Sequence, residues 1–74
     1  MTLYEITMTK DGEYYYTTEK PIDSIKELIK AWTTLRKIFK PSKGYGYTLN
    51  KFDSLGRGQT IDYKTEIKNH KHDG

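Results

Sequence analysis

The stretch Ser24–Phe39 constrains the fold most, because it alone keeps a helical pattern of apolar residues over several turns. Its apolar residues recur three and four positions apart, which is typical of a helix with one buried side. They are Ile25, Leu28, Ile29, Trp32, Leu35 and Phe39, with Ala31 and Ile38 at the margins. Ser24 and Glu27 have the spacing of a capping box, with Asp23 as the alternative cap. We therefore predict an amphipathic helix that covers a hydrophobic core.

The polar side of this predicted helix is basic. Lys26, Lys30 and Lys37 follow one flank, and Lys40 lies a little further around, just before Pro41, where the helix should end. Such a row is usually a solvated surface, and the alternative is a cationic ridge that contacts an acidic partner. The net charge of +3 has its origin here, since residues 24–57 hold eight basic and two acidic side chains, whereas residues 1–23 hold two and five.

Residues 3–20 predict a β-hairpin. Two runs rich in β-branched and aromatic residues flank Asp11-Gly12, a pair typical of a two-residue type I′ turn. That turn would pair Met8 with Tyr15, and would likewise place Ile6 opposite Thr17. We assign the more apolar set to the helix-facing side: Tyr4, Ile6, Met8 and Tyr15. Tyr14 and Tyr16 then lie among threonines on the outer face, where they either cover the sheet or belong to a binding surface.

A second hairpin is predicted after the helix, with strands near residues 45–52 and 60–68. The later strand alternates, with Ile61, Tyr63, Thr65 and Ile67 inward. In the earlier strand the same alternation turns Lys51 inward and Phe52 outward, so we expect an edge or a bulge there. The fold class is thus α+β, in the order ββαββ, with an antiparallel sheet of two hairpins and one amphipathic helix packed across one face. We expect a single domain over residues 1–69 and a disordered tail over 70–74.

Length and composition argue against an enzyme. A chain of 74 residues with 34% hydrophobic side chains and no cysteine has little core from which to build a deep catalytic pocket. Its carboxylates are dispersed, and His70 and His72 fall in the predicted tail, so we expect no cofactor and no metal site. No apolar run approaches 20 residues and no signal peptide is evident, so we expect a cytoplasmic protein that does not bind membranes.

The segment Lys43-Gly44-Tyr45-Gly46-Tyr47 resembles the first ribonucleoprotein motif of RNA-recognition domains over these five positions. In that family the motif implies aromatic rings that stack on bases. Thr48 and Asn50 depart from the pattern, and a hairpin before a single helix departs from the βαββαβ order of the family. We therefore interpret the two glycines as residues that begin a strand. The nearby tyrosines remain available for stacking on a base or on a protein side chain.

Arg57 lies between two glycines in the loop that should join the last two strands. Such a loop is usually a flexible connection, and the alternative is an arginine that reaches a phosphate or a carboxylate.

Two functional hypotheses follow. The first is a small protein-interaction module, an inhibitor or adaptor of the phage or mobile-element type, that covers a surface of a larger host protein. That host protein could itself associate with nucleic acid, and a homodimer is a further alternative. The second is direct nucleic-acid binding by helix lysines and exposed tyrosines. The residues that we expect at the binding surface are Lys26, Lys30, Lys37, Lys40, Tyr14, Tyr16, Tyr45 and Arg57.

Overall fold

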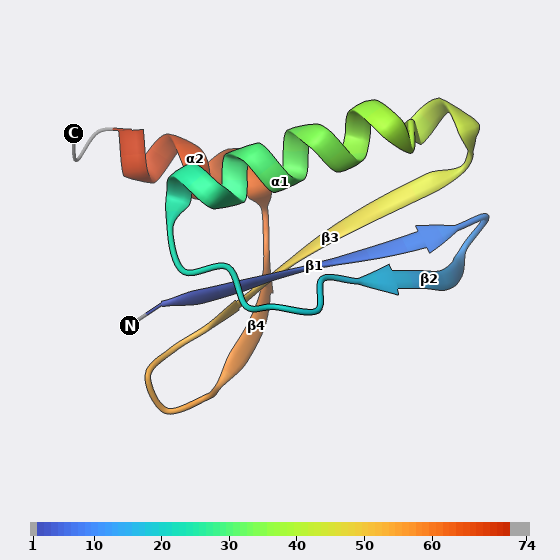
Figure 1. Ribbon diagram of the computed structural model, residues 1–74. Coiled ribbons are helices and arrows are strands. Elements are labelled where there is room, and N and C mark those ends of the chain that lie inside the picture. The colour runs from blue at the N-terminus through green and yellow to red at the C-terminus, as the bar shows by residue number, and fades with distance from the viewer. Residues whose placement is uncertain (1, 72–74) are drawn as a thin grey trace.

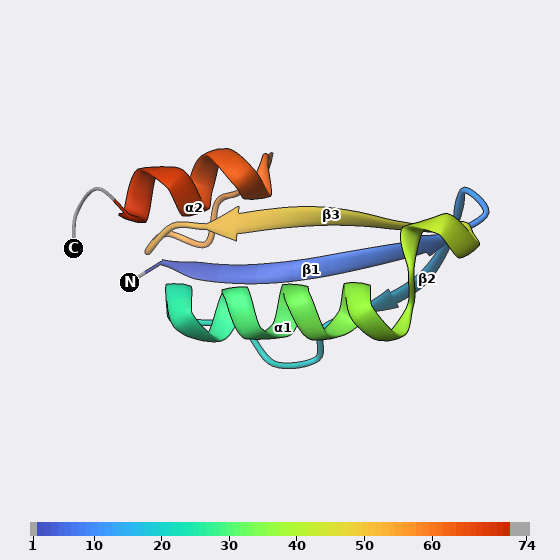
Figure 2. The ribbon, with the colours of Figure 1, turned by 90° about the horizontal axis from the view of Figure 1, so that it is seen from above.

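The computed structural model describes residues 2–71, which form one four-stranded antiparallel sheet and two α-helices. In chain order the elements are β1 (Leu3–Lys10), β2 (Glu13–Thr17), α1 (Ile25–Ile38), the 3-10 turn η1 (Pro41–Lys43), β3 (Tyr45–Phe52), β4 (Gly58–Ile61) and α2 (Tyr63–Lys71). The strands lie in the order β2-β1-β3-β4. Both helices cover the same face of the sheet and lie side by side over it (Figures 1 and 2). The predicted α+β class is confirmed, whereas the predicted ββαββ order lacks the second helix.

Helix α1 forms where its periodicity predicts it. The Ser24 hydroxyl accepts a hydrogen bond from the Glu27 amide at 3.1 Å, which satisfies one of the unpaired donors at the helix start. Leu28 and Trp32 point into the core and are buried. The helix ends at Ile38, two residues before the Lys40-Pro41 step.

The hydrophobic core lies between the two central strands and the two helices. Strands β1 and β3 contribute one row of alternate residues each, since successive side chains of a strand point to opposite faces. The buried cluster consists of Tyr4, Ile6, Leu28, Trp32, Leu49 and Ile67. Met8 is also fully buried, so the predicted helix-facing assignment of Tyr4, Ile6 and Met8 is confirmed.

The first hairpin has the predicted turn but a different register. Asp11 and Gly12 both have positive φ, 52° and 86°, as a type I′ turn requires. Between Met8 and Thr9 the pairing shifts by one residue, so that Met8 faces Tyr16 and Thr7 faces Thr17. The predicted pairs Met8–Tyr15 and Ile6–Thr17 are therefore wrong. Tyr16, opposite the buried Met8, lies on the helix-facing side of the sheet and not on the outer face as predicted.

The cause is a β-bulge in which Tyr15 is the extra residue of the strand. Its ring packs near Phe39 at the end of α1, with the two ring centroids 5.9 Å apart. Strand β2 then ends early, and Ile22 pairs with Tyr4 further along the same edge of β1.

The last predicted strand is mostly a helix, which is the main correction to the fold. Only Gly58–Ile61 pairs with β3, and α2 follows at once. The Asp62 carboxylate starts α2, because it accepts hydrogen bonds from the Thr65 amide and hydroxyl at 3.0 and 2.9 Å. The helix continues through Lys71, so it includes two residues of the predicted tail, and the remainder of that tail lies outside the described residues.

Strands β1 and β3 pair without interruption from Leu3–Phe52 to Lys10–Tyr45, so the bulge predicted near Lys51 is absent from this pairing. Lys51 does point toward the helices, as the alternation predicts, and it finds a partner there, Glu66 of α2. Phe52 points to the other face, where its ring lies against Gly58.

The sheet face opposite the helices carries a row of hydrogen-bonded polar side chains. The Asn50 amide donates to the Thr7 hydroxyl at 3.3 Å, and the Thr60 hydroxyl donates to the Asn50 carbonyl at 3.1 Å. The hydroxyls of Thr7 and Thr17 lie 3.3 Å apart. This hydroxyl row crosses all four strands, and each of its members is therefore partnered within the sheet.

Candidate partner-binding surface

Positive charge is concentrated in the helical layer of the molecule. Residues 25–43 and 63–70, which contain α1, η1 and α2 up to its last residue, hold eight basic and two acidic residues. Residues 2–24 and 44–62, which contain the strands and their loops, hold four basic and seven acidic residues. One of the two acids in the helical layer, Glu66, is buried. The helical side of the protein therefore presents a basic surface, and the sheet side is weakly acidic.

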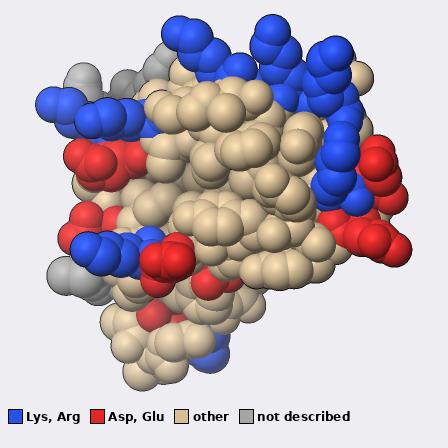
Figure 3. All heavy atoms as spheres, turned by 45° about the vertical axis from the view of Figure 1, so that its right-hand side comes forward, with Lys and Arg blue, Asp and Glu red and all other residues tan. Residues whose placement is uncertain are grey.

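The basic surface is centred on four exposed lysines, Lys26, Lys30, Lys37 and Lys40, which we call the lysine ridge. The first three lie about half a turn away from Leu28 and Trp32, given 3.6 residues per turn, so they point away from the sheet. In Figure 3, Lys and Arg side chains form the upper margin of the molecule, and an uncharged area fills the centre.

An exposed apolar surface lies on the β2 side of this ridge. Ile38 is 65% exposed at the end of α1, and Tyr15 and Tyr16 in the bulged part of β2 are 47% and 38% exposed. We call these three residues the tyrosine face. Phe39 follows Ile38 in the chain, and its ring contacts the ring of Tyr15. The tyrosine face therefore joins the end of α1 to β2.

Packed rings support the tyrosine face from within. The centroid of Tyr45 lies 5.4 Å from that of Tyr15 and 5.2 Å from that of Phe39, in edge-to-face geometry. The Lys10 ammonium lies 4.4 Å from the Tyr45 centroid and donates to the Lys43 carbonyl. A cation already occupies one side of the Tyr45 ring, which makes Tyr45 a supporting residue more than a free contact.

The Tyr47 hydroxyl fixes the end of α1 over β3. It lies 2.9 Å from the Leu35 carbonyl oxygen and also within hydrogen-bond distance of the Phe39 carbonyl oxygen. It has one proton, so it can donate to only one of these two carbonyls at a time, and the Leu35 carbonyl also accepts from the Phe39 amide. The contact keeps Ile38 and Phe39 in place at the border of the tyrosine face.

The structure divides the sequence-predicted binding residues among four places. The four lysines form the ridge, and Tyr16 and Tyr45 lie at or beneath the tyrosine face. Tyr14 pairs with Thr9 on β1, a position of the other sheet face, and is 70% exposed. Arg57 lies at the far end of the sheet, in the β3–β4 loop.

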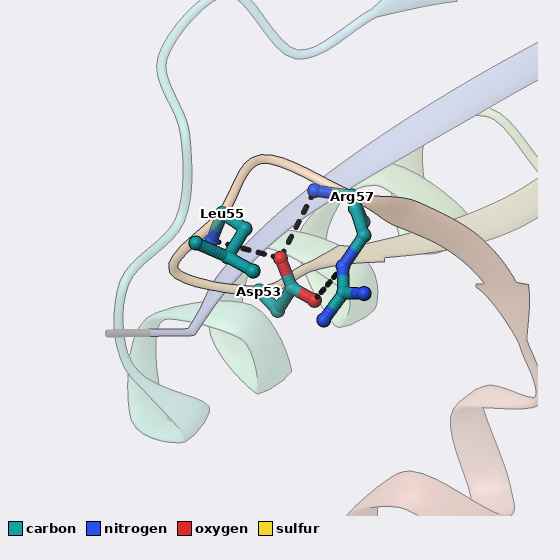
Figure 4. Close-up of polar contacts among 3 residues, drawn as sticks. All are labelled: Asp53, Leu55 and Arg57. Carbon is teal, nitrogen blue, oxygen red and sulfur yellow. Dashed lines mark hydrogen bonds and ion pairs between the residues drawn. The ribbon is translucent and has the colours of Figure 1, made fainter.

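Arg57 is held by its own loop, as Figure 4 shows. The Asp53 carboxylate accepts hydrogen bonds from the Leu55 amide, the Arg57 amide and Arg57 Nε, at 2.9, 3.0 and 2.9 Å. These hydrogen bonds lower the pKa of Asp53. The bond from the Arg57 amide has the largest effect, and the bonds from the Leu55 amide and the Arg57 side chain have smaller ones. Arg57 thus organises a turn, and it does not join the lysine ridge.

A buried polar cluster beneath α2 was not predicted. Glu66 is 7% exposed and accepts a 2.5 Å hydrogen bond from the Tyr4 hydroxyl, and its Oε2 lies 2.9 Å from Lys51 Nζ. His70 Nε2 lies 3.4 Å from the same oxygen. The sequence does contain a signal for this cluster, because four residues recur at the three- and four-residue spacing of one helix side. They are Tyr63, Glu66, Ile67 and His70. The cluster attaches α2 to the sheet and lies away from the lysine ridge.

Among residues 2–70, no group of three or more His, Asp or Glu side chains is placed to hold a metal ion. No helix in the described part of the chain is long and apolar enough to cross a membrane. Comparison with protein-family models, with curated proteins and with solved structures finds no match to this chain.

Proposed function

We propose that this protein is a small non-enzymatic interaction module, an inhibitor or adaptor that covers an acidic surface of a larger protein. The observation that carries the proposal is the position of the tyrosine face directly beside the lysine ridge. Interfaces combine a central aromatic and aliphatic patch, which supplies most of the affinity, with charged residues at the rim that steer association. Tyr15, Tyr16 and Ile38 have the first role in the proposal, and the ridge has the second.

The positions of Tyr45 and Tyr14 favour a protein partner over nucleic acid. A single-strand binder needs open aromatic rings along a basic groove. Tyr45 already packs against two rings and a lysine, and Tyr14 lies on the sheet face that lacks the ridge. The segment that resembles the first ribonucleoprotein motif, residues 43–47, therefore has few free ring faces on which bases could stack.

Affinity capture with quantitative mass spectrometry tests the proposal. The double variant Lys30→Glu/Lys37→Glu changes the ridge beside Ile38. The matched variant Lys20→Glu/Lys68→Glu changes the net charge equally at exposed positions outside the ridge. We expect the first variant to lose the captured partner and the second to retain it. Equal capture by both variants would contradict the proposal.

A titration of labelled single- and double-stranded nucleic acid at low and high salt separates the two hypotheses. Micromolar binding that weakens steeply with salt and is lost in the ridge variant would replace the protein partner with nucleic acid. Absence of binding at low salt is the expected result.

A further inference from the structure

A groove follows the other flank of α1, between this helix, β3 and the start of α2. Three adjoining cavities of about 340, 320 and 460 Å³ form it, and Trp32 and Arg36 line all three. Arg36 and Ile38 lie on opposite flanks of α1, so this Arg36 groove is separate from the tyrosine face. Its other main lining residues are Tyr47, Tyr63, Lys37 and Lys64. Each cavity falls at the small end of the roughly 300–1,000 Å³ range of ligand sites, which suits one or two side chains.

The wall of the groove is aromatic. Tyr63 stacks on Trp32 with ring centroids 4.3 Å apart and an interplanar angle of 3°. Tyr47 packs against Trp32 from β3 at 5.7 Å. The indole Nε1 of Trp32 is buried and has no hydrogen-bond acceptor within the described residues. The wall of the groove is thus aromatic, and the unsatisfied indole donor lies below its surface.

The charges along the groove are predominantly positive. Arg36, Lys37 and Lys64 line it, and the carboxylate that lines it, Asp62, is already engaged by Thr65. Within residues 2–70, no carboxylate lies within 4.0 Å of the Arg36 guanidinium. Burial raises the pKa of Tyr47 and of Tyr63, and the nearby charge of Arg36 opposes both shifts, which is consistent with a guanidinium near both hydroxyls.

We infer that the Arg36 groove binds an acidic peptide segment, whose carboxylate pairs with Arg36 while an adjacent apolar side chain packs against Tyr47 and Tyr63. An exposed guanidinium without a protein carboxylate is suited to bidentate pairing with a carboxylate. This inference rests on the proposed function, since the segment would belong to the same acidic partner that covers the ridge.

The rings of the groove favour a peptide over a nucleic-acid base. Trp32 is 8% exposed, and Tyr63 covers one of its faces. A base needs an open ring face on which to stack. A side chain can pack against ring edges and hydroxyls, which the groove does present.

A peptide titration followed by NMR tests the inference. The probe is the acetylated and amidated peptide Glu-Asp-Phe-Asp-Glu, and its matched control is Lys-Lys-Phe-Lys-Lys, which keeps the phenylalanine and reverses the charge. Trp32 is the only tryptophan, so its indole N–H gives one unambiguous signal in the groove wall. We expect the acidic peptide to shift this signal in a saturable way and the basic peptide to leave it unchanged.

Two charge-neutralising variants locate the site. Arg36→Gln should raise the dissociation constant of the acidic peptide about tenfold, as expected for loss of one charge-assisted pair. Lys30→Gln, an equal charge change on the lysine ridge, should change it much less. If both variants weakened binding of the acidic peptide equally, or if the basic peptide bound, the inference that the groove binds an acidic segment would be wrong. The proposal for the lysine ridge would still stand. A saturable indole shift with oligothymidylate that Arg36→Gln removes would instead assign the groove to nucleic acid.

Discussion

Lys51 of β3 and Glu66 of α2 form an ion pair on the helical side of the sheet, with 2.9 Å between Nζ and Oε2. The Tyr4 hydroxyl donates to the same carboxylate oxygen, so Glu66 joins the two central strands to the last helix. An inward lysine would otherwise leave a charge near the core without a partner, which is costly. The pair therefore accounts both for the orientation of Lys51 and for the position of α2.

Loss of this carboxylate should destabilise the fold. We expect Glu66→Ala to lower the free energy of unfolding by about 2 kcal/mol, because the Tyr4 hydroxyl and Lys51 both lose their partner. Urea unfolding measures the change. Glu13→Ala, which removes an exposed carboxylate of β2, is the control and should leave the midpoint nearly unchanged.

The same carboxylate should make stability depend on pH. Burial raises the pKa of Glu66, but the hydrogen bonds from Lys51 and Tyr4, with the charges of Lys51 and His70, lower it below its ordinary value of 4.5. A carboxyl with a lowered pKa adds stability above the unfolded-state pKa, and this stability is lost as the pH falls through the folded-state pKa. The stability difference between the wild type and Glu66→Gln should therefore shrink between about pH 6 and about pH 3. A difference that stays constant would show that Glu66 carries no such linkage.

Trp32 should be the residue on which the core depends most. Trp32→Ala removes the ring between Tyr47 and Tyr63 and should cost about 3–5 kcal/mol. A chain of this length has a total stability of roughly 0.05–0.15 kcal/mol per residue, so this loss is a large fraction of the stability and should lower the melting temperature strongly. Trp32→Phe should fold with a lower melting temperature in thermal denaturation. A melting curve of Trp32→Ala that matches the wild type would refute the assignment.

The start of α2 should depend on Asp62. Asp62→Ala removes the acceptor of the Thr65 amide and should destabilise the protein by about 1 kcal/mol. Hydrogen exchange should then be faster for α2 amides than for α1 amides. Ser42→Ala, at an exposed position of η1 without a capping hydrogen bond, is the matched change. Uniform acceleration in both helices would indicate general destabilisation without a specific role of the cap.

The elements that the sequence predicts correctly are those specified by neighbours in the chain. The apolar stripe of α1 spans several turns, and the Asp11-Gly12 turn requires only two residues with positive φ. The alternation in β3 likewise places Lys51 and Phe52 on the correct faces. These features need no information about distant contacts.

The last helix could not be separated from a strand by pattern alone. Ile61, Tyr63, Thr65 and Ile67 alternate, while Tyr63, Glu66 and Ile67 also have helical spacing, and the segment is too short to decide between these patterns. What selects the helix is the docking of Glu66 onto Tyr4, a residue 62 positions away in the chain. The bulge at Tyr15 has a similar origin, because the ring contacts of Tyr15 lie on α1 and β3.

The candidate site was predicted only in part, because some of its features depend on neighbours in the chain and others on distant contacts. The ridge is a local property of one helix, so its lysines are exposed where expected. The tyrosine face depends on the bulge, and the Arg36 groove depends on α2, so neither could be recognised before those elements were placed. Arg36 itself lies four residues after Trp32, a spacing that puts it at the edge of the buried stripe.

The hydroxyl row on the open sheet face has a consequence for colloidal behaviour. Sheets that stack into fibrils need dry faces whose side chains interlock after water has left. Here Thr7, Asn50 and Thr60 are already bonded to one another across the strands, so a second sheet stacked on them would bury polar groups and gain little. We therefore expect this uncovered sheet face to resist stacking against a second sheet.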